Sequence, residues 1–165
     1  MDKKIITIKP FKKSHIKETF AWVKDEELQK LFMMREKPTW ENHVKYFNKI
    51  LNDNTQKVFA IYYDDMHVGN CGLKNITQRD AEFWIYLGNK KFKHKGIGTF
   101  ATNLLLDMGF NYLNLDTIYL HVANFNIFAI NMYKNIGFKQ VQLDMKTIEQ
   151  WGNRSKILIK MEIKR

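Results

Sequence analysis

Two glycines interrupt a basic stretch in the middle of the chain, which reads Lys93-His94-Lys95-Gly96-Ile97-Gly98-Thr99. The β-branched and aromatic run at 81–87 before it is typical of a strand. After it, apolar residues recur at helical spacing as far as Tyr112. Glycines let a backbone turn tightly and bare its N–H groups, and the N-terminus of a helix attracts anions. We therefore expect a phosphate-binding loop, in which the three basic side chains also face the anion and Thr99 caps the helix or adds a hydroxyl.

The same loop partly matches a dinucleotide-binding fingerprint, Gly96-x-Gly98-x-x-Ala101, with Asp116 at about the right distance. That fingerprint requires a turn directly after the strand, but residues 88–95 intervene here. Its acidic residue closes the next strand, whereas Asp116 precedes the run at 117–122. A nucleotide-binding oxidoreductase is therefore the more distant alternative.

Length and composition indicate one globular domain over residues 1–165, because 45% of the residues are hydrophobic and 14% aromatic. A single cysteine, Cys71, excludes an internal disulfide and a cysteine-rich zinc site, and the five histidines show no metal-ligand spacing. We expect no metal. No signal peptide and no apolar run of about 18 residues is visible, which predicts a cytoplasmic protein without membrane insertion.

The formal net charge of +10 favours anionic ligands. The lysines are spread along the chain and no nucleic-acid-binding motif is present, so we expect phosphorylated small molecules and no nucleic acid as partners. A basic binding module without chemistry would fit the same charge.

The order of predicted elements gives an α+β fold. A strand at 5–10 is followed by a helix with Ser14 as its expected N-cap, by a second helix at 25–34 and by a third after Thr39. Three strands at 57–63, 67–74 and 81–87 then form an antiparallel meander. The glycine loop and its helix lead to a strand at 117–122, which a right-handed crossover places parallel to 81–87. A helix from Asn126 to Gly137 and two final strands complete a mixed, mostly antiparallel central sheet with helices on both faces.

Two motifs in this order resemble the GNAT superfamily of acetyl-CoA-dependent N-acetyltransferases. The first family pattern is Gln/Arg-x-x-Gly-x-Gly/Ala, and here it is Lys93-His-Lys-Gly96-Ile-Gly98. The second is Asn126-x-x-Ala129-x-x-x-Tyr133-x-x-x-Gly137-Phe138. This chain differs from the family pattern at Lys93, where the family has Gln or Arg. The difference leaves the backbone N–H groups of the loop available for phosphate but puts one side-chain contact in question. The resemblance implies a single GNAT-like domain that uses acetyl-CoA as co-substrate.

The resemblance also implies roles for residues of the site. The loop from Lys93 to Thr99 would hold the CoA phosphates, and Asn126 would cap its helix and contact the cofactor. In the family, the strand before the loop splays from its parallel neighbour and pantetheine pairs with the freed backbone. The N–H groups of Tyr86, Leu87 and Gly88 would then polarise the thioester carbonyl. Tyr133 would protonate the departing thiolate, since a phenol with a pKa near 10 is a suitable acid. The amine would attack directly, without a covalent acetyl-enzyme.

Two residues are candidates for the base that neutralises the acceptor amine. Glu82 lies on the strand before the loop, and alternation places it on one face with Trp84 and Tyr86. His121 lies near the end of the neighbouring strand, and a neutral imidazole suits the task.

Two branches of the superfamily are similar to this chain. One acetylates ribosomal proteins and small amines; the other acetylates nucleotide-linked amino sugars for surface glycans and is similar at 32–47 and 72–77. Arg35 and Lys37 stand in a loop that borders the acceptor in similar folds, and Arg35 could clamp a phosphate. Trp40 could stack on a base or sugar, and Trp84 lies near the expected mouth. We expect a nucleotide-linked amino sugar as acceptor, with a protein N-terminus or a polyamine as the alternative, and a homodimer is compatible with this assignment.

Overall fold

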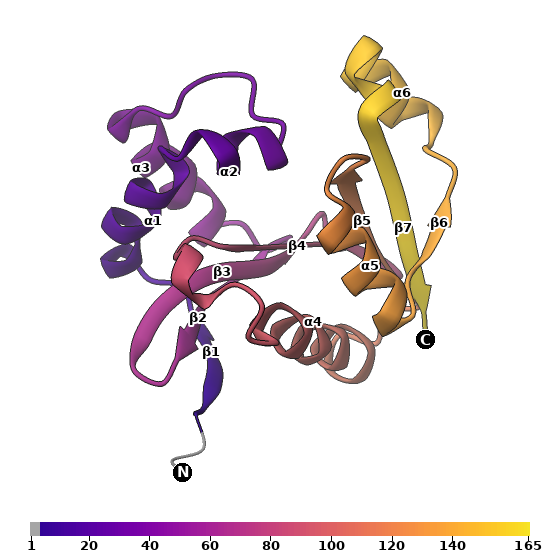
Figure 1. Ribbon diagram of the computed structural model, residues 1–165. Helices are drawn as coiled ribbons and strands as arrows, with labels where there is room; N and C mark the ends of the chain where they lie inside the picture. Colours follow the sequence, from indigo (N-terminus) through magenta and orange to yellow (C-terminus); the bar gives the residue numbers. More distant parts are fainter. Residues whose placement is uncertain (1–3) are drawn as a thin grey trace.

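The computed structural model describes residues 4–165, in which a seven-stranded sheet carries helices on both faces (Figure 1). The strand order across the sheet is β1-β2-β3-β4-β5-β7-β6. The strands are β1 Ile6–Pro10, β2 Lys57–Tyr63, β3 Met66–Lys74, β4 Asp80–Leu87, β5 Thr117–Ala123, β6 Lys139–Val141 and β7 Leu158–Lys164. The helices are α1 Ile16–Val23, α2 Glu26–Leu31, α3 Trp40–Leu51, α4 Ile97–Asp107, α5 Ile127–Ile136 and α6 Met145–Trp151. The predicted α+β class with a mixed, mostly antiparallel sheet is confirmed.

The parallel pairing of β4 and β5 is short. It covers only the register from Asp80 opposite Thr117 to Glu82 opposite Tyr119. Beyond Glu82, β4 continues beside β3 while β5 continues beside β7, so the sheet opens between its two halves (Figure 1). Backbone groups of β4 that would have paired with β5 are therefore released along residues 83–87.

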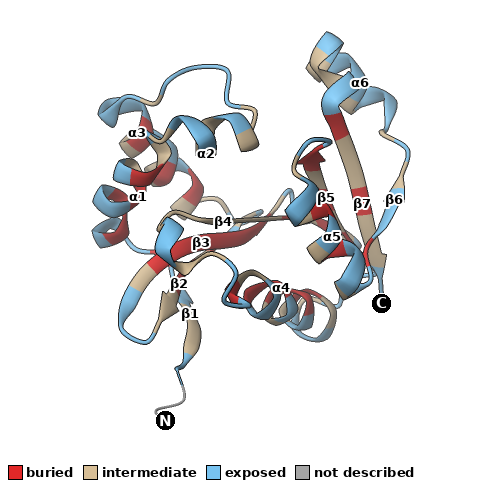
Figure 2. Ribbon diagram, viewed as in Figure 1, coloured by how far each residue is buried: buried red, intermediate tan, exposed pale blue. Residues whose placement is uncertain are grey.

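Each face of the sheet has its own apolar core. On one face, Ala101 and Leu105 of α4 and Ile130 of α5 pack with Phe83. On the other face, Ile16 of α1 and Phe47 and Ile50 of α3 pack with Val58 and Ala60 of β2, and Trp84 rests against them. Figure 2 shows the buried residues of α4 and of α1 and α3 turned toward the sheet. The predicted alternation along β4 is confirmed, since Phe83 and Trp84 serve opposite cores.

A buried polar network joins the N-terminal helices to β4. Nε2 of His67 donates to Oδ1 of Asn70 at 2.8 Å, and Nδ2 of Asn70 donates to the hydroxyls of Thr19 at 2.9 Å and Tyr86 at 2.8 Å. Burial lowers the pKa of His67 and raises the pKa of Tyr86, so both stay neutral near pH 7. Both side-chain amide hydrogens of Asn70 are thus donated in hydrogen bonds. The bond to its hydroxyl holds the ring of Tyr86 in one position at the wall of the cleft between β4 and β5.

Three local expectations differ from the structure. The helix expected at 25–34 is only α2, because Asp25 caps it by accepting from the N–H of Leu28 at 3.0 Å and Met33 leaves helical geometry with a φ of 51°. The expected N-cap, Ser14, lies inside a short 3₁₀ turn, Lys13–His15, that precedes α1. Helix α6 was not predicted, although Asp144 caps it at the N–H of Thr147, a signal that the sequence contains.

Among the described residues, no helix combines the length and apolarity needed to cross a bilayer.

Candidate active site

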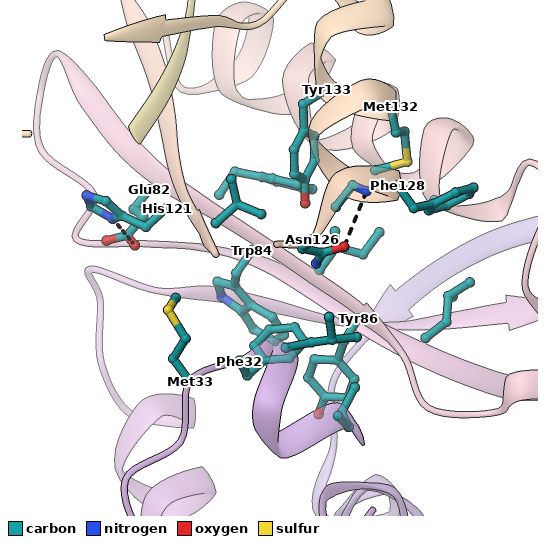
Figure 3. A pocket seen from close by; sticks show the side chains of 18 of the residues that line it. Phe32, Met33, Glu82, Trp84, Tyr86, His121, Asn126, Phe128, Met132 and Tyr133 are labelled. Atoms are coloured by element: carbon teal, nitrogen blue, oxygen red, sulfur yellow. Dashed lines mark hydrogen bonds and ion pairs between the residues drawn. The ribbon is translucent and has the colours of Figure 1, made fainter. Parts of the chain in front are cut away.

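A cleft of about 1380 Å³ opens where β4 and β5 separate. Segments from both halves of the molecule line it: α2 and residues 32–33, the strand β4, the loop before α4, the end of β5, the first turns of α5, and α6. Figure 3 shows Glu82 and His121 at one side, the hydroxyl of Tyr133 directed toward the middle, and Asn126, Phe128 and Met132 beyond it.

The glycine loop forms an anion cradle at one end of this cleft. Gly96 adopts a φ of 75°, a left-handed conformation that favours glycine, and serves as N-cap of α4. The first N–H of α4 that donates to a backbone carbonyl of the same helix is that of Phe100, which donates to the carbonyl of Gly96 at 3.0 Å. The N–H groups of Ile97, Gly98 and Thr99 are therefore free of helical partners and lie along the cleft. These donors fit a phosphate group.

The basic side chains of the loop are placed differently from the expectation. Nζ of Lys93 lies 3.3 Å from Glu27, and Nζ of Lys90 lies 2.9 Å from Asp25 and 2.8 Å from Glu27. The hydrogen bonds from Lys90 hold the pKa values of both carboxyls below their usual range. His94 borders the cleft, whereas Lys95 is exposed and is not one of the described lining residues. Lys90, which sequence reasoning did not select, thus borders the cleft with Lys93.

Only one of the three expected backbone donors of β4 faces the opening. The N–H of Gly88 donates to the carbonyl of Val68 in β3 at 2.9 Å. Successive N–H groups of a strand point to opposite edges, so the N–H of Tyr86 is also directed to β3, and that of Leu87 is directed to the edge that β5 has left. Gly88 has a packing role, because a Cβ there would overlap the ring of Trp22. The expectation for Tyr86 and Gly88 as carbonyl-polarising donors is thus wrong, and Leu87 remains.

Helix α5 carries Asn126 and Tyr133 to the other wall of the cleft. Oδ1 of Asn126 accepts from the N–H of Ala129 at 3.4 Å, which confirms the predicted cap. The ring of Tyr133 is 6% exposed and packs edge-on against Phe83 and Phe138. Burial raises the pKa of Tyr133, so its phenol keeps the proton at neutral pH. Its hydroxyl has no hydrogen-bond partner among residues 4–165 and is available to a ligand.

The two base candidates form one pair. Nδ1 of His121 lies 2.9 Å from Oε1 of Glu82, and both side chains are largely buried. Burial alone would raise the pKa of Glu82, but the hydrogen bond from His121 and the nearby charge of Lys74 outweigh it, so the pKa lies below its usual range. An ionised Glu82 fixes the proton of His121 on Nδ1. Nε2 of His121 is then an acceptor, and it is buried without a partner in the described part of the chain.

Aromatic and amide side chains from both halves of the molecule also line the cleft. They are Phe32, Trp84, Tyr119 and Trp151, with Asn75 and Gln150. Burial raises the pKa of Tyr119 to about 12. Tyr119, Gln150 and Trp151 were not selected from the sequence. Gln150 and Trp151 end α6, a helix that was not predicted, and recognition of the Asp144 cap was the signal that could have pointed to them.

Of the four residues expected to bind the acceptor, only Trp84 lines the cleft. Nη2 of Arg35 donates to the carbonyl of Gln150 at 3.3 Å, and Lys37 is exposed. Trp40 packs its ring against Phe20, with centroids 5.3 Å apart, on the outer side of α3. Arg35, Lys37 and Trp40 are thus outside the described lining, because the segment after α2 turns away at Met33. In residues 4–165, no cluster of three or more His, Cys, Asp or Glu side chains could hold a metal ion.

Comparison with known proteins identifies the family of the domain. Residues 6–139 match the model of the acetyltransferase (GNAT) domain. The acetyltransferase PseH of Campylobacter jejuni is 26% identical over 132 residues, which cover 73% of this chain and 82% of PseH. The spermidine N(1)-acetyltransferase of Escherichia coli K12 is 34% identical over 94 residues, which cover 56% of this chain and 50% of that enzyme.

Solved structures share the fold across nearly the whole chain. The spermidine N-acetyltransferase of Vibrio cholerae, in complex with CoA and spermine, superposes with a TM-score of 0.82 at 22% identity and covers 96% of this chain and 95% of that one. Campylobacter jejuni PseH in complex with acetyl coenzyme A gives a TM-score of 0.70 at 22% identity and covers 98% and 99% of the two chains. The family model spans most of the sequence, and the chain belongs to the GNAT family of acetyltransferases.

Proposed function

We propose that this acetyltransferase moves the acetyl group of acetyl-CoA to an amino group on a nucleotide-linked sugar. The observation that carries the proposal is the meeting of three features in one cleft: the free N–H groups at the start of α4, the unpartnered hydroxyl of Tyr133 and the Glu82–His121 pair. The first suits the phosphates of CoA, and the other two suit proton transfers at either end of the reaction.

The chain offers a place for each part of acetyl-CoA. Ile97, Gly98 and Thr99 would hold phosphate oxygens through their N–H groups. Lys90 and Lys93 lie beside them, and phosphates would compete with Asp25 and Glu27 for their charges. The released edge of β4 would pair with the pantetheine amides, and the N–H of Leu87 would meet the thioester carbonyl.

Proton transfers follow from the two sides of the cleft. Nε2 of His121 is buried in the free protein, so the acceptor would displace the side chains that cover it. The Glu82–His121 pair then takes a proton from the acceptor ammonium at Nε2, which frees the amine lone pair. The amine forms the new C–N bond at the thioester carbon, and the N–H of Leu87 stabilises the oxyanion. The C–S bond then breaks, and Tyr133 gives its proton to the thiolate sulfur. The nitrogen, which carries a positive charge after attack, loses its second proton, and this proton restores the phenol of Tyr133.

Charge pairing within the cleft favours a sugar over a polyamine. A polyamine carries several ammonium groups and needs free carboxylates. Here Glu82 lies 3.6 Å from Lys74 and binds His121, and Asp144 lies 3.6 Å from Lys160. Oδ1 of Asp80 accepts from the hydroxyl of Thr77 at 2.7 Å. These three carboxylates are engaged, and the other two in the lining, Asp25 and Glu27, pair with Lys90 in the free protein. The rings of Trp84 and Trp151 offer surfaces for a sugar or base.

An acceptor screen tests this assignment. Consumption of acetyl-CoA is measured with a panel of amino-sugar nucleotides, with spermidine and with N-terminal peptides. We expect kcat/KM for at least one amino-sugar nucleotide to exceed that for spermidine by about tenfold or more, a difference of about 1.4 kcal/mol. Efficient use of spermidine or peptides with no turnover of any amino-sugar nucleotide would reject the acceptor and leave the acetyltransferase assignment intact.

Replacing Gly98 by valine is expected to weaken CoA binding at least about tenfold, or about 1.4 kcal/mol, as measured by calorimetry. A Cβ at Gly98 would lie 3.0 Å from Sδ of Met132, so the valine methyl groups have to displace that side chain or occupy space beside the N–H groups of the cradle.

Two lysine variants serve as controls for Gly98→Val. Lys93→Ala should cost less, because its ammonium is shared with Glu27 in the free protein. Lys95→Ala should change the affinity little, because Lys95 is exposed outside the lining. Normal CoA binding by Gly98→Val would show that the start of α4 is not the phosphate site.

A further inference from the structure

Two segments that lie far apart in the sequence meet across one end of the cleft. Phe32 and Met33 follow α2, and Gln150 and Trp151 close α6; all four line the cleft. The α2 segment belongs to the half of the molecule that contains β1–β4, and α6 stands at the end of β7 in the other half (Figure 1). A contact between them therefore joins the two halves of the molecule across this end of the cleft.

Two arginines make that contact in a crossed arrangement, which we call the arginine bridge (Arg154 to Met33 and Arg35 to Gln150). Nη2 of Arg154 donates to the backbone carbonyl of Met33, 121 residues away in the sequence. Nη2 of Arg35 donates to the backbone carbonyl of Gln150 at 3.3 Å. Each segment thus supplies one guanidinium to the backbone of the other.

Arg154 also contacts a lining side chain directly. Its guanidinium carbon lies 4.7 Å from the centroid of the Trp151 ring. A planar guanidinium can stack on an aromatic ring and donate at its edge at the same time, which a lysine ammonium cannot do. Only four of the 27 basic residues of the chain are arginines, at positions 35, 79, 154 and 165, and two of the four form the bridge.

The turn at Met33 supplies the acceptor carbonyl. Met33 adopts a φ of 51°, which ends α2 and redirects the chain. A non-glycine residue holds this conformation when its surroundings compensate the strain, and the bond from Arg154 to its carbonyl is such compensation. Loss of Arg154 would remove the hydrogen bond to the carbonyl of Met33 and the stacking contact with the ring of Trp151, so both residues could change position.

We propose that Arg154 is a positioning residue that holds Met33 and Trp151 opposite each other and thereby sets the size of the acceptor end of the cleft. The proposal rests on the proposed function, because it assigns this end of the cleft to the acceptor. The phosphate cradle at Gly96–Thr99 is built by other segments, so CoA occupies a different part of the cleft. Arg154 touches neither that cradle nor Tyr133, so its loss should act on acceptor binding alone.

The test uses Arg154→Met and Arg154→Lys in the full chain, with Arg79→Met as the matched control. Arg79 makes an exposed ion pair with Asp116 at 3.0 Å and does not line the cleft. Steady-state kinetics use the best amine from the screen of amino-sugar nucleotides and spermidine. We expect Arg154→Met to raise the acceptor KM about tenfold, or about 1.4 kcal/mol, with the KM for acetyl-CoA within about twofold of wild type. Arg154→Lys should recover only part of the loss, and Arg79→Met should change neither constant.

Hydrogen exchange supplies a readout that needs no substrate. In Arg154→Met, the amides of residues 32–37 should exchange at least about tenfold faster, while those of α4 keep their protection. Unchanged exchange at 32–37 together with an unchanged acceptor KM would overturn the proposal. If spermidine and not a sugar nucleotide proves to be the substrate, the proposed acceptor fails, but a raised KM for spermidine in Arg154→Met still supports the bridge. A variant that raises both KM values equally, with a lower melting temperature, would assign Arg154 a merely structural role.

Discussion

Tyr133→Phe is expected to lower kcat by about 10²- to 10⁴-fold, the range of general acid contributions, while CoA affinity changes less than about twofold. The substitution removes one hydroxyl and keeps the ring that packs against Phe83 and Phe138. The hydroxyl makes no hydrogen bond within residues 4–165, so its loss leaves no protein partner unsatisfied and the fold should keep its stability. Burial raises the pKa of Tyr133, so the phenol is fully protonated where the enzyme is assayed and can supply a proton to a thiolate.

The measurement is single-turnover acetyl transfer, which separates chemistry from product release, with calorimetry for CoA affinity. Tyr112→Phe is the matched control, because Tyr112 is 77% exposed at the far end of the helix that follows the loop and should show wild-type turnover. An unchanged chemical rate in Tyr133→Phe would leave Tyr133 with a packing role only.

His121→Asn is expected to lower kcat/KM by about 10²-fold or more, because it removes the nitrogen that accepts the proton. An asparagine amide can still donate to Glu82 from roughly the position of Nδ1, so the partner of Glu82 is kept. The atom that disappears is Nε2, which is buried without a partner in the described structure.

Glu82→Gln separates the two roles within the pair. Glutamine keeps an oxygen for Nδ1 of His121 but loses the negative charge that stabilises a protonated ring. If His121 is the base, Glu82→Gln should lower kcat/KM by about tenfold, which is less than the loss expected for His121→Asn. Both variants are measured over the same range of pH. A larger loss in Glu82→Gln than in His121→Asn would make Glu82 the base and His121 its support.

The pH dependence tests the role of Glu82 independently. The pKa of Glu82 is lower in the folded protein than its ordinary value of 4.5, so its charge is present above that value and is lost only as pH falls through the lowered pKa. We therefore expect the difference in kcat/KM between the wild type and Glu82→Gln to persist at about pH 5 and above, and to disappear only in more acidic buffer. A difference that already vanishes above about pH 5 would show that the charge of Glu82 does not support the reaction.

The sequence by itself determined the family, the fold class and the ends of the principal elements. Gly96 and Gly98 between a strand and a helix, and Asn126 and Gly137 around another helix, act through local backbone geometry. Caps, turns and hydrophobic alternation depend on neighbours within a few residues, so their signals survive in the sequence. For the same reason the start of α4 could be expected at the cleft, whereas Asn126 and Tyr133 were expected there from the resemblance to the family.

Only the tertiary structure decided how the remaining groups are used. The pairing of Glu82 with His121, of Lys93 with Glu27, and of Gly88 with Val68 joins residues that are distant in the chain, and no local pattern records it. The end of the cleft that we assign to the acceptor depends on α6 and on the turn at Met33, and Arg35 donates there to the backbone carbonyl of Gln150. Side-chain direction at such places follows from how two halves of a sheet separate, and that separation is a property of the packed molecule.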